Sequence, residues 1–404
     1  MSDQYPGHPP DPQSPGYPTQ GAPASGYPPP DAPAPVPGGG ATAPGKGTGG
    51  PLSYPCAGCG ARVEYSPGTT TLQCPYCGYR QQIAATDTVV QEHSYAQWAG
   101  MPTKPRAQLA AHTLKCRSCG AETQTEDLSG ACGFCGAPVV VEVSTDPQIA
   151  PEAIVPFAVD QRAAQDAVRG WVRTRRFAPN RLKKVGASET MKGTYLPFWT
   201  FDASTESDYD GARGEHYWET EEYTDGEGHR QTRQVMRTAW YPARGHVARD
   251  FDDVLVPASG HLPADRLASM GPWAPQGGVP YQPDYLSGFR TLRYDIEPDQ
   301  GLDHAKSVMA DTIEDDCRSD IGGDEQRVSS VRTDYQSVMF KLVLMPVWIA
   351  AYLYGGKTFQ VLVNAHTGTV VGERPYSPVK IAFAVLAGLI VLAIAVLIYS
   401  RTRR

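Results

Sequence analysis

Four C-x-x-C pairs hold eight of the nine cysteines in this chain, and in every pair the second cysteine is followed directly by glycine. Two such turns joined by a short hairpin bring four sulfur atoms to one point, which is the tetrahedral ligand set that zinc prefers. A glycine without Cβ restraint suits a backbone that curls back around a metal ion. The pattern therefore predicts small modules whose fold depends on bound metal.

The pairs form an internal repeat, with 14 residues between the inner cysteines of the first copy and 12 in the second. We expect two small β zinc ribbons, over residues 53–85 and 112–145, each holding one structural zinc ion. All coordination positions would be filled by protein, so catalysis at the metal is not expected. Iron bound as in rubredoxin, or redox-active thiols, are the alternatives. The predicted ligands are Cys56, Cys59, Cys74 and Cys77 in the first ribbon and Cys116, Cys119, Cys132 and Cys135 in the second.

The chain begins MSDQYPGHPP, which lacks the basic and apolar regions of a secretory signal peptide. We therefore expect the cysteines to lie in a reducing compartment, where paired C-x-x-C motifs are typical of metal sites and not of disulfides.

Residues 1–52 are rich in proline and glycine, with 14 Pro and 11 Gly in the first 50 positions. A segment with so little apolar surface cannot offset its ordering entropy, so we expect a disordered tether with polyproline II character. It is either a solvated spacer or a docking site for a proline-binding module. Residues 86–111, between the two ribbons, are expected to form a linker with a short helix.

Residues 150–376 are expected to form an antiparallel α+β domain, because runs typical of strands are not regularly separated by helices. Asp160 is placed to cap a first helix, and a second helix is predicted over 302–321. The polar stretch 208–228 is predicted to be a long hairpin loop, with its turn at Asp225–Gly226. Strands are predicted over 155–159, 195–203, 231–241 and 251–256, and in runs between 327 and 371 with turns at 355–356 and 364–368.

Two short sequences in this domain resemble each other: Leu-Pro-Phe-Trp at 196–199 and Met-Pro-Val-Trp at 345–348. Proline is tolerated at the start of a strand, and the tryptophan after it can fill a core. The repeat indicates either a duplicated half-domain or ordinary core packing.

Residues 381–399 are uncharged and strongly apolar, and at 1.5 Å per residue they would form a helix about 28 Å long. We predict a single transmembrane helix over 380–399, followed by a basic tail at 400–404. Three tail arginines favour a cytoplasmic C-terminus. Export of the large thiol-rich N-terminal part is harder than export of a four-residue tail, so we expect that part on the cytoplasmic face of the bacterial membrane.

The net charge of −7 argues against nucleic acid as the main partner. Residues 53–145 contain six basic and seven acidic residues, and each four-thiolate zinc centre would add a charge of about −2.

Three other features of the sequence are not expected to form functional sites. Cys317 is expected on the core-facing side of a helix. The run from Gly40 to Gly47 lacks the Ser or Thr of a phosphate-binding loop. A polar cluster is expected to be a solvated face: His216, Glu219, Glu221, Glu222 and His229.

The four C-x-x-C-G knuckles, the two Pro-Trp strands, the run Val-Asn-Ala-His-Thr-Gly-Thr-Val-Val-Gly at 363–372 and the apolar C-terminus together resemble a bacterial family. Its members are described as TFIIB-type zinc-ribbon-containing single-pass membrane proteins, and some carry the label of primosomal protein N′ or replication factor Y. The resemblance covers about residues 53–400. It implies a non-enzymatic, membrane-anchored adaptor linked to membrane-stress systems of the phage-shock or SPFH type.

We therefore expect a multidomain chain whose zinc ribbons and α+β domain bind protein partners at the membrane. A membrane-tethered nucleic-acid-binding protein, related to transcription or replication, is the first alternative. An enzyme with a site in residues 150–376 is the second. Walker motifs, nucleophile elbows and dinucleotide fingerprints are missing from the sequence, and a small-molecule substrate is not expected.

Overall fold

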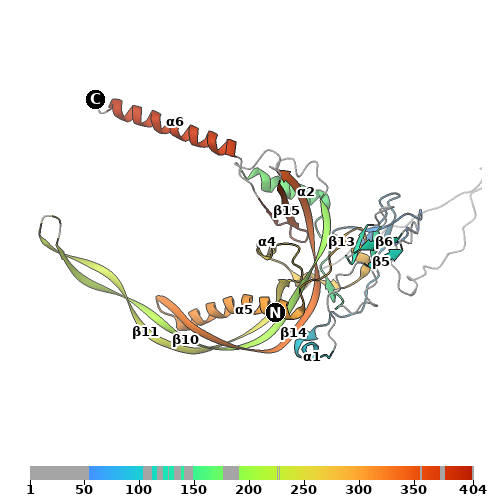
Figure 1. The fold of residues 1–404 in the computed structure, drawn as a ribbon, viewed down its shortest axis with the longest axis horizontal. Helices are drawn as coiled ribbons and strands as arrows, with labels where there is room; N and C mark the ends of the chain where they lie inside the picture. Colours follow the sequence, from blue (N-terminus) through green and yellow to red (C-terminus); the bar gives the residue numbers. More distant parts are fainter. Residues whose placement is uncertain are drawn as a thin grey trace, which may run out of the picture. The chain divides into compact units, whose positions relative to one another are not determined.

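The computed structural model describes residues 54–102, 112–115, 122–125, 127–131, 138–140, 149–175, 191–224, 226, 228–354, 357–373 and 378–402. The predicted tether at 1–52 lies outside these residues. The described residues belong to one compact unit, Thr48–Arg404. Its body is rich in sheet, with one 11-stranded, one three-stranded and one two-stranded sheet (Figure 1).

The two smaller sheets lie in the segments predicted to be zinc ribbons. Strands β1 to β3 pair antiparallel in the order β1-β2-β3, and β5 pairs antiparallel with β6. A short helix follows β4 in the predicted linker. The elements of this part are β1 (Glu64–Tyr65), β2 (Thr71–Gln73), β3 (Arg80–Gln82), β4 (His93–Ser94), α1 (Tyr95–Ala99), β5 (His112–Lys115), β6 (Glu122–Thr125), β7 (Ser129–Ala131) and β8 (Pro138–Val140).

The large sheet is built around β10 (Lys192–Thr224) and β14 (Glu325–Tyr354), which pair antiparallel along most of their length. Strand β11 (Arg230–Pro257) returns along β10 as a long hairpin. The remaining elements are β9 (Ala153–Ile154), α2 (Gln161–Arg173), α4 (Ala264–Ser269), η2 (Pro275–Gly277), β12 (Val279–Pro280), η3 (Pro283–Leu286), β13 (Arg290–Thr291), α5 (Pro298–Ile321), β15 (Lys357–Asn364), β16 (Val370–Gly372) and α6 (Pro378–Thr402).

The prediction of a hairpin loop over 208–228 is wrong, because residues 208–224 continue β10 as regular strand. The stretch is polar because its strand has solvent on at least one face, not because it lacks sheet pairing. Side chains from 203 to 209 alternate between buried and exposed, as expected for a sheet with one covered face. The predicted strands 231–241 and 251–256 are likewise parts of one strand, β11. The predicted strand 155–159 is also wrong, because the strand in this part of the chain is β9, Ala153–Ile154, and residues 155–159 follow it without strand structure.

The two predicted helices are confirmed with small changes of length. Asp160 caps α2, since its Oδ1 accepts a hydrogen bond from the N–H of Ala163 at 2.7 Å. Helix α5 begins four residues before the predicted start and ends at Ile321, where Gly322 adopts a φ of +64°. Cys317 is fully buried on the core face of α5, as its spacing predicted.

The two Pro-Trp sequences start from one residue pair, Leu196 and Met345, on the neighbouring strands β10 and β14 of the large sheet. Leu196 of β10 pairs with Met345 of β14, and because the strands are antiparallel the two sequences run in opposite directions from this pair, so Pro197 lies opposite Leu344 and Pro346 lies opposite Tyr195. Both prolines lie where the outer neighbour of their strand changes. On β10 the neighbour changes from β13, at Thr194 and Tyr195, to β11 from Phe198 onward. On β14 it changes from β9, at Val343 and Leu344, to β15 from Val347 onward.

A missing proline N–H costs no ladder hydrogen bond at such a change of partner, which explains how proline is tolerated inside these strands. The carbonyl groups remain bonded and are matched in the two strands. Pro197 O accepts from Ala258 N and Pro346 O accepts from Ala365 N, both at 3.0 Å.

This repeated pattern divides the body into a first half (β9, α2, β10 and β11) and a second half (β13, α5, β14 and β15). Each half starts with a short stretch that pairs with the other half, and we name these the crossing segments 153–160 and 290–297. Trp199 Nε1 donates to Ile296 O, and Trp348 Nε1 donates to Val159 O, both at 2.8 Å. The two halves therefore exchange their first strands, which supports the interpretation as a duplicated unit.

The core follows the same division. One cluster surrounds Trp348 and α2, a second surrounds Trp199 and α5, and a third lies at the Leu196–Met345 pair. The first cluster also includes Val63, Tyr65 and Leu72 of the first predicted ribbon, so that ribbon packs into the body.

Candidate metal centre

The first cysteine quartet is built from two knuckles of the same backbone shape. In the first knuckle Gly60 N donates to Cys56 O at 2.9 Å, and in the second Gly78 N donates to Cys74 O at 3.0 Å. Both glycines adopt positive φ values, +70° and +74°. Only glycine takes this left-handed conformation without strain, which accounts for the Gly after each C-x-x-C pair.

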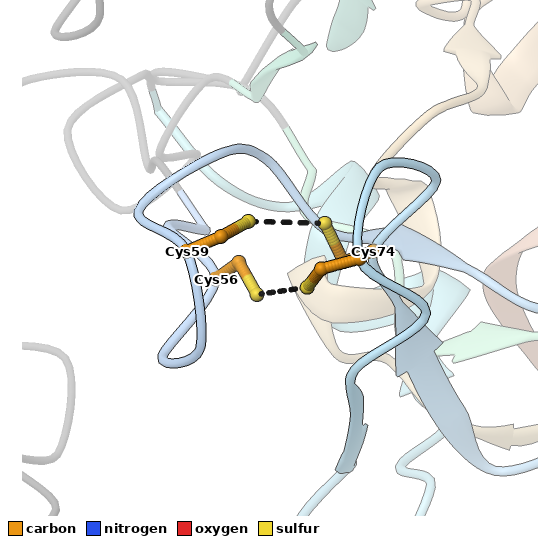
Figure 2. Close-up of side chains that lie close together, drawn as sticks. Cys56, Cys59 and Cys74 are labelled. Atoms are coloured by element: carbon orange, nitrogen blue, oxygen red, sulfur yellow. Dashed lines mark hydrogen bonds between the residues drawn. The ribbon is translucent and has the colours of Figure 1, made fainter.

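The knuckles bring the four sulfur atoms within 4.8 Å of one another. Cys56 Sγ lies 3.5 Å from Cys77 Sγ, and Cys59 Sγ lies 3.7 Å from Cys74 Sγ (Figure 2). A tetrahedral zinc ion with Zn–S bonds of about 2.3 Å requires sulfur–sulfur separations of roughly 3.8 Å. The four side chains present therefore fit one tetrahedral metal ion, as the spacing predicted.

The environment of the quartet favours thiolate at one position. Burial raises the pKa of Cys74, but N–H groups of Cys77 and Tyr76 lower it more, and the resulting pKa is about 7. The N–H of Tyr79 lowers the pKa of Cys77, but the neighbouring thiols of Cys59 and Cys56 raise it more, so its net direction is upward. Four sulfurs this close can all ionise only around a cation. The quartet is thus suited to a divalent metal that binds thiolates.

One side of the centre faces solvent and the other faces the body. Cys56 and Cys74 are buried, whereas Cys59 and Cys77 are exposed. On the exposed side, the guanidinium of Arg62 lies 5.8 Å from the ring of Tyr76. A centre open on one side can be reached by a chelator without unfolding the whole body.

The ribbon is fixed to the body by hydrogen bonds as well as by apolar packing. Tyr65 N donates to Ser287 O at 2.9 Å, and Ser287 Oγ donates to Val63 O at 2.8 Å. Gly68 N donates to Phe157 O of the first crossing segment at 2.7 Å. The metal centre is therefore tied to the place where the two halves exchange strands.

The second predicted quartet, Cys116, Cys119, Cys132 and Cys135, lies outside the described residues, so its geometry stays a prediction. Strands around it are described: β5 pairs with β6, and β7 pairs with β8. Strand β7 also joins the large sheet, because Ser129 pairs with Thr291 of β13. Ser129 Oγ donates to Thr291 Oγ1 at 2.6 Å.

A cluster of charged groups that the sequence did not reveal lies where β4, the strand before α1, meets the large sheet. The carboxylates of Glu92, Asp202 and Asp253 lie within 4.8 Å of one another. Lys341 Nζ lies 2.7 Å from Glu92 and 2.6 Å from Asp253, so an ammonium group already balances part of their charge. Burial and the hydrogen bond with Glu92 raise the pKa of Asp202 to about 7. We interpret the cluster as a structural ion network and not as a metal site.

The other residues singled out in the sequence do not form a site in the described structure. His216 pairs with Glu325 on the neighbouring strand, with 2.9 Å between Nε2 and Oε1. Glu219 and Glu221 pair with arginines across the β10–β11 hairpin, and Glu222 is exposed. His229 is exposed beyond the end of β10. The run 40–47 lies outside the described residues.

The C-terminal helix α6 contains a stretch, Lys380–Arg401, that is long and apolar enough to cross a membrane. None of its most apolar window is buried against the rest of the protein. An exposed apolar surface of this size needs a nonaqueous neighbour, which agrees with the prediction of a membrane span.

Comparison with known proteins gives one curated relative. The chain is 24% identical over 341 residues to a protein described as "Uncharacterized protein YdjG" of Bacillus subtilis (strain 168). The alignment covers 83% of this chain and 94% of that protein. No family model matches the chain, and no solved structure matches it.

Proposed function

We propose that this chain is a membrane-anchored zinc-ribbon adaptor, in which zinc is structural and the ribbons and sheet body bind protein partners. The observation that carries the proposal is the closed quartet Cys56, Cys59, Cys74 and Cys77, whose four sulfurs fill a tetrahedral set. Such a set leaves no coordination position for water or substrate, so the metal would shape a surface and not catalyse a reaction.

Two further features support an adaptor. The apolar stretch of α6 would hold the body at a bilayer, and the acidic net charge of −7 disfavours phosphate backbones as the main ligand. We also propose that the second quartet holds a second zinc ion, and that the chain belongs with the TFIIB-type zinc-ribbon proteins it resembles. We further propose that the body lies on the cytoplasmic side, and that the chain acts in a membrane-stress system of the phage-shock or SPFH type.

The zinc part is tested by metal analysis of full-length protein purified in detergent. We expect two zinc ions per chain, and a loss of one ion in Cys56→Ser combined with Cys59→Ser. The same loss is expected for Cys116→Ser with Cys119→Ser. Cys317→Ser is the matched control, because this buried cysteine lies in α5, outside both quartets. Zinc content unaffected by either double substitution would contradict the proposal.

The adaptor part is tested by crosslinking in intact cells followed by purification from the membrane. We expect a defined set of protein partners with the wild type, and loss of some of them when the second quartet is substituted. Recovery of no partner protein other than further copies of the chain would reject an adaptor. A reporter fused after Arg404 tests the orientation, since activity confined to the cytoplasm would place the body on the other side.

A further inference from the structure

The end of the β10–β11 hairpin is a two-stranded arm that the rest of the body does not cover. We define the arm as residues 215–224 of β10 and 230–239 of β11, which remain paired up to Thr224 and Arg230. Strand β14 stops pairing with β10 at Gly214, and α5 ends at Ile321 (Figure 1). Within the described residues, the arm therefore has neither a third strand nor a helix packed against it.

Both long edges of the arm are open over the same length. The β10 edge is capped once, at its base, where His216 N donates to Asp324 Oδ2 at 2.7 Å. In the described sheet β11 pairs with β10 and with no other strand. The open edge on each side is about ten residues, roughly 33 Å, long, and along it the main-chain groups of alternate residues face outward. Such edges are templates for the addition of another strand.

The described arm also lacks two of the features that usually prevent strand addition, proline and β-bulges. Proline and β-bulges block the edges of many natural sheets. In β11 the one internal proline, Pro242, lies below the arm, and the register between β10 and β11 is regular from Ala203 to the tip. An isolated two-stranded hairpin of this length is only marginally stable by itself, so a neighbouring strand would stabilise it.

The two open edges carry opposite charge. In residues 215–224 of β10 there are four acidic residues and no Lys or Arg, and in 230–239 of β11 there are three arginines and no Asp or Glu. Within one arm, Arg233 donates to Glu221 at 2.7 and 2.9 Å, and Arg237 pairs with Glu219. If the acidic edge of one arm met the basic edge of another, the same alternation of acid and base would continue across the junction.

The face of the arm opposite these ion pairs carries an exposed apolar pair. This pair would also be repeated along a sheet formed by several copies. Trp218 and Met236 lie opposite each other in the register and are 67% and 53% exposed. In a continued sheet, Met236 of one copy would lie beside Trp218 of the next. This contact removes apolar surface from water and adds to the main-chain hydrogen bonds.

From the matching open edges, their opposite charge and the exposed apolar pair, we propose that the arms of neighbouring copies of this chain pair edge to edge, with β10 of one copy against β11 of the next. The two edges differ, so the contact is heterologous and builds a row or ring rather than a two-fold dimer. Copies held in one membrane share an orientation and are concentrated in two dimensions, which lets a small contact suffice.

The test uses two differently tagged full-length chains expressed in one membrane and purified in mild detergent through one tag. A charge-swapped variant combines Glu219→Arg and Glu221→Arg with Arg233→Glu and Arg237→Glu, which keeps the ion pairs within each arm. Wild type is expected to co-purify with wild type, and swapped with swapped. Mixed pairs place like charges together, and their yield should fall at least about tenfold.

A second variant keeps the proposal testable if the swapped arm does not fold. Both main-chain groups of a residue in an antiparallel strand point to the same side, and alternate residues share that side. The main-chain groups of Thr220 therefore point outward, like those of His216. The substitution Thr220→Pro removes an outward N–H without breaking the hydrogen bonds between β10 and β11. We expect loss of co-purification in Thr220→Pro and its retention in Thr220→Ala. Equal recovery of mixed and matched pairs, retention in Thr220→Pro, or no association of wild-type chains would each overturn the proposal.

Discussion

The two halves of the body share a strand exchange but differ in what they build around it. In both, a crossing segment from the other half lies against a buried tryptophan, with an aromatic ring packed on it. Phe157 packs on Trp348 with ring centroids 5.2 Å apart, and Tyr294 packs on Trp199 at 5.1 Å. The hairpins differ: β10 and β11 have 33 and 28 residues, whereas β15 has eight.

The helices differ in step with the hairpins they cover. Helix α2 has 13 residues and packs against β15 and β16, whereas α5 has 24 residues and packs against β11 and β10. Each helix thus covers the hairpin of the other half. The comparison indicates that the crossing is the part common to both halves, and that the longer hairpin is covered by the longer helix.

The two crossing segments also differ in the parts of the protein that they contact. Removal of the metal should reveal this difference, with the largest effect of the changes proposed in this section. Phe157 O of the first crossing segment accepts from Gly68 of the metal-binding ribbon. Structural zinc contributes about 10–16 kcal/mol to the fold of small modules. In Cys56→Ser with Cys59→Ser, we expect faster hydrogen–deuterium exchange in 153–160 and α2.

In the same double variant we expect no change in the second crossing segment, 290–297. There the corresponding aromatic side chain, Tyr294, accepts a hydrogen bond from Ile149 N at 3.2 Å and packs in the core cluster around Trp199. Cys317→Ser is the control for loss of a cysteine alone. Equal acceleration in both crossing segments would mean that the metal centre supports the two halves alike.

Truncation of the two tryptophans tests whether the crossings are equivalent. Trp199 and Trp348 are buried, and each donates its indole N–H to a crossing segment. Replacement of either by alanine should cost about 3–5 kcal/mol. We expect urea unfolding of the detergent-solubilised protein to show similar losses for the two variants.

Trp218→Ala provides the baseline for this experiment, because Trp218 is exposed and makes no crossing contact. Its effect on the unfolding free energy should stay within about 0.5 kcal/mol. A large loss for one buried tryptophan and a small loss for the other would show that one crossing carries most of the stability.

The smallest expected effect is a pH dependence confined to the first half. Asp202 and Ala351 each lie three residues after the core tryptophan of their half, so only the first half has a titrating group there. Burial and Glu92 raise the pKa of Asp202 to about 7, against roughly 3.9 in an unfolded chain. The folded state binds the extra proton between these values, so this group lowers stability as the pH rises from about 4 to 7.

Asp202→Asn should remove that contribution and raise the unfolding free energy at pH 8 by about 1 kcal/mol, after allowance for solvent screening. It should leave stability near pH 4 unchanged. Urea unfolding at the two pH values measures the difference. Burial raises the pKa of Glu92, but Asp202 and Lys341 lower it more, so Glu92→Gln should act with the opposite sign. A gain in Asp202→Asn that is equal at both pH values would exclude titration as the cause.

Local patterns were sufficient to predict those parts of the structure that depend on neighbours in the chain. The cap at Asp160, the core position of Cys317 and the first cysteine quartet all follow from spacings of a few residues or one short hairpin. The C-x-x-C-G pattern was specific because the ligand geometry and the positive φ of Gly60 and Gly78 both require it.

Contacts between distant residues could not be predicted from one sequence. Glu92 and Lys341 lie 249 positions apart, and nothing in the local pattern of either residue indicates the other. The stretch 208–224 was predicted to be a loop because its polar residues suggest solvent. Its strand structure depends on the partners β11 and β14, and on a sheet face left open to water.

The exchange between halves has a consequence for synthesis on the ribosome. The carbonyl group of Ile296, which accepts the hydrogen bond from the Trp199 indole, lies 97 positions after Trp199 in the chain. Trp348 is made 189 positions after its own acceptor, the carbonyl group of Val159. At about 5–20 residues per second, 97 residues take roughly 5–20 seconds to translate. During that interval Trp199 has neither its hydrogen-bond acceptor nor the ring of Tyr294 beside it, so the first half of the body cannot complete its core until the second crossing segment has been made.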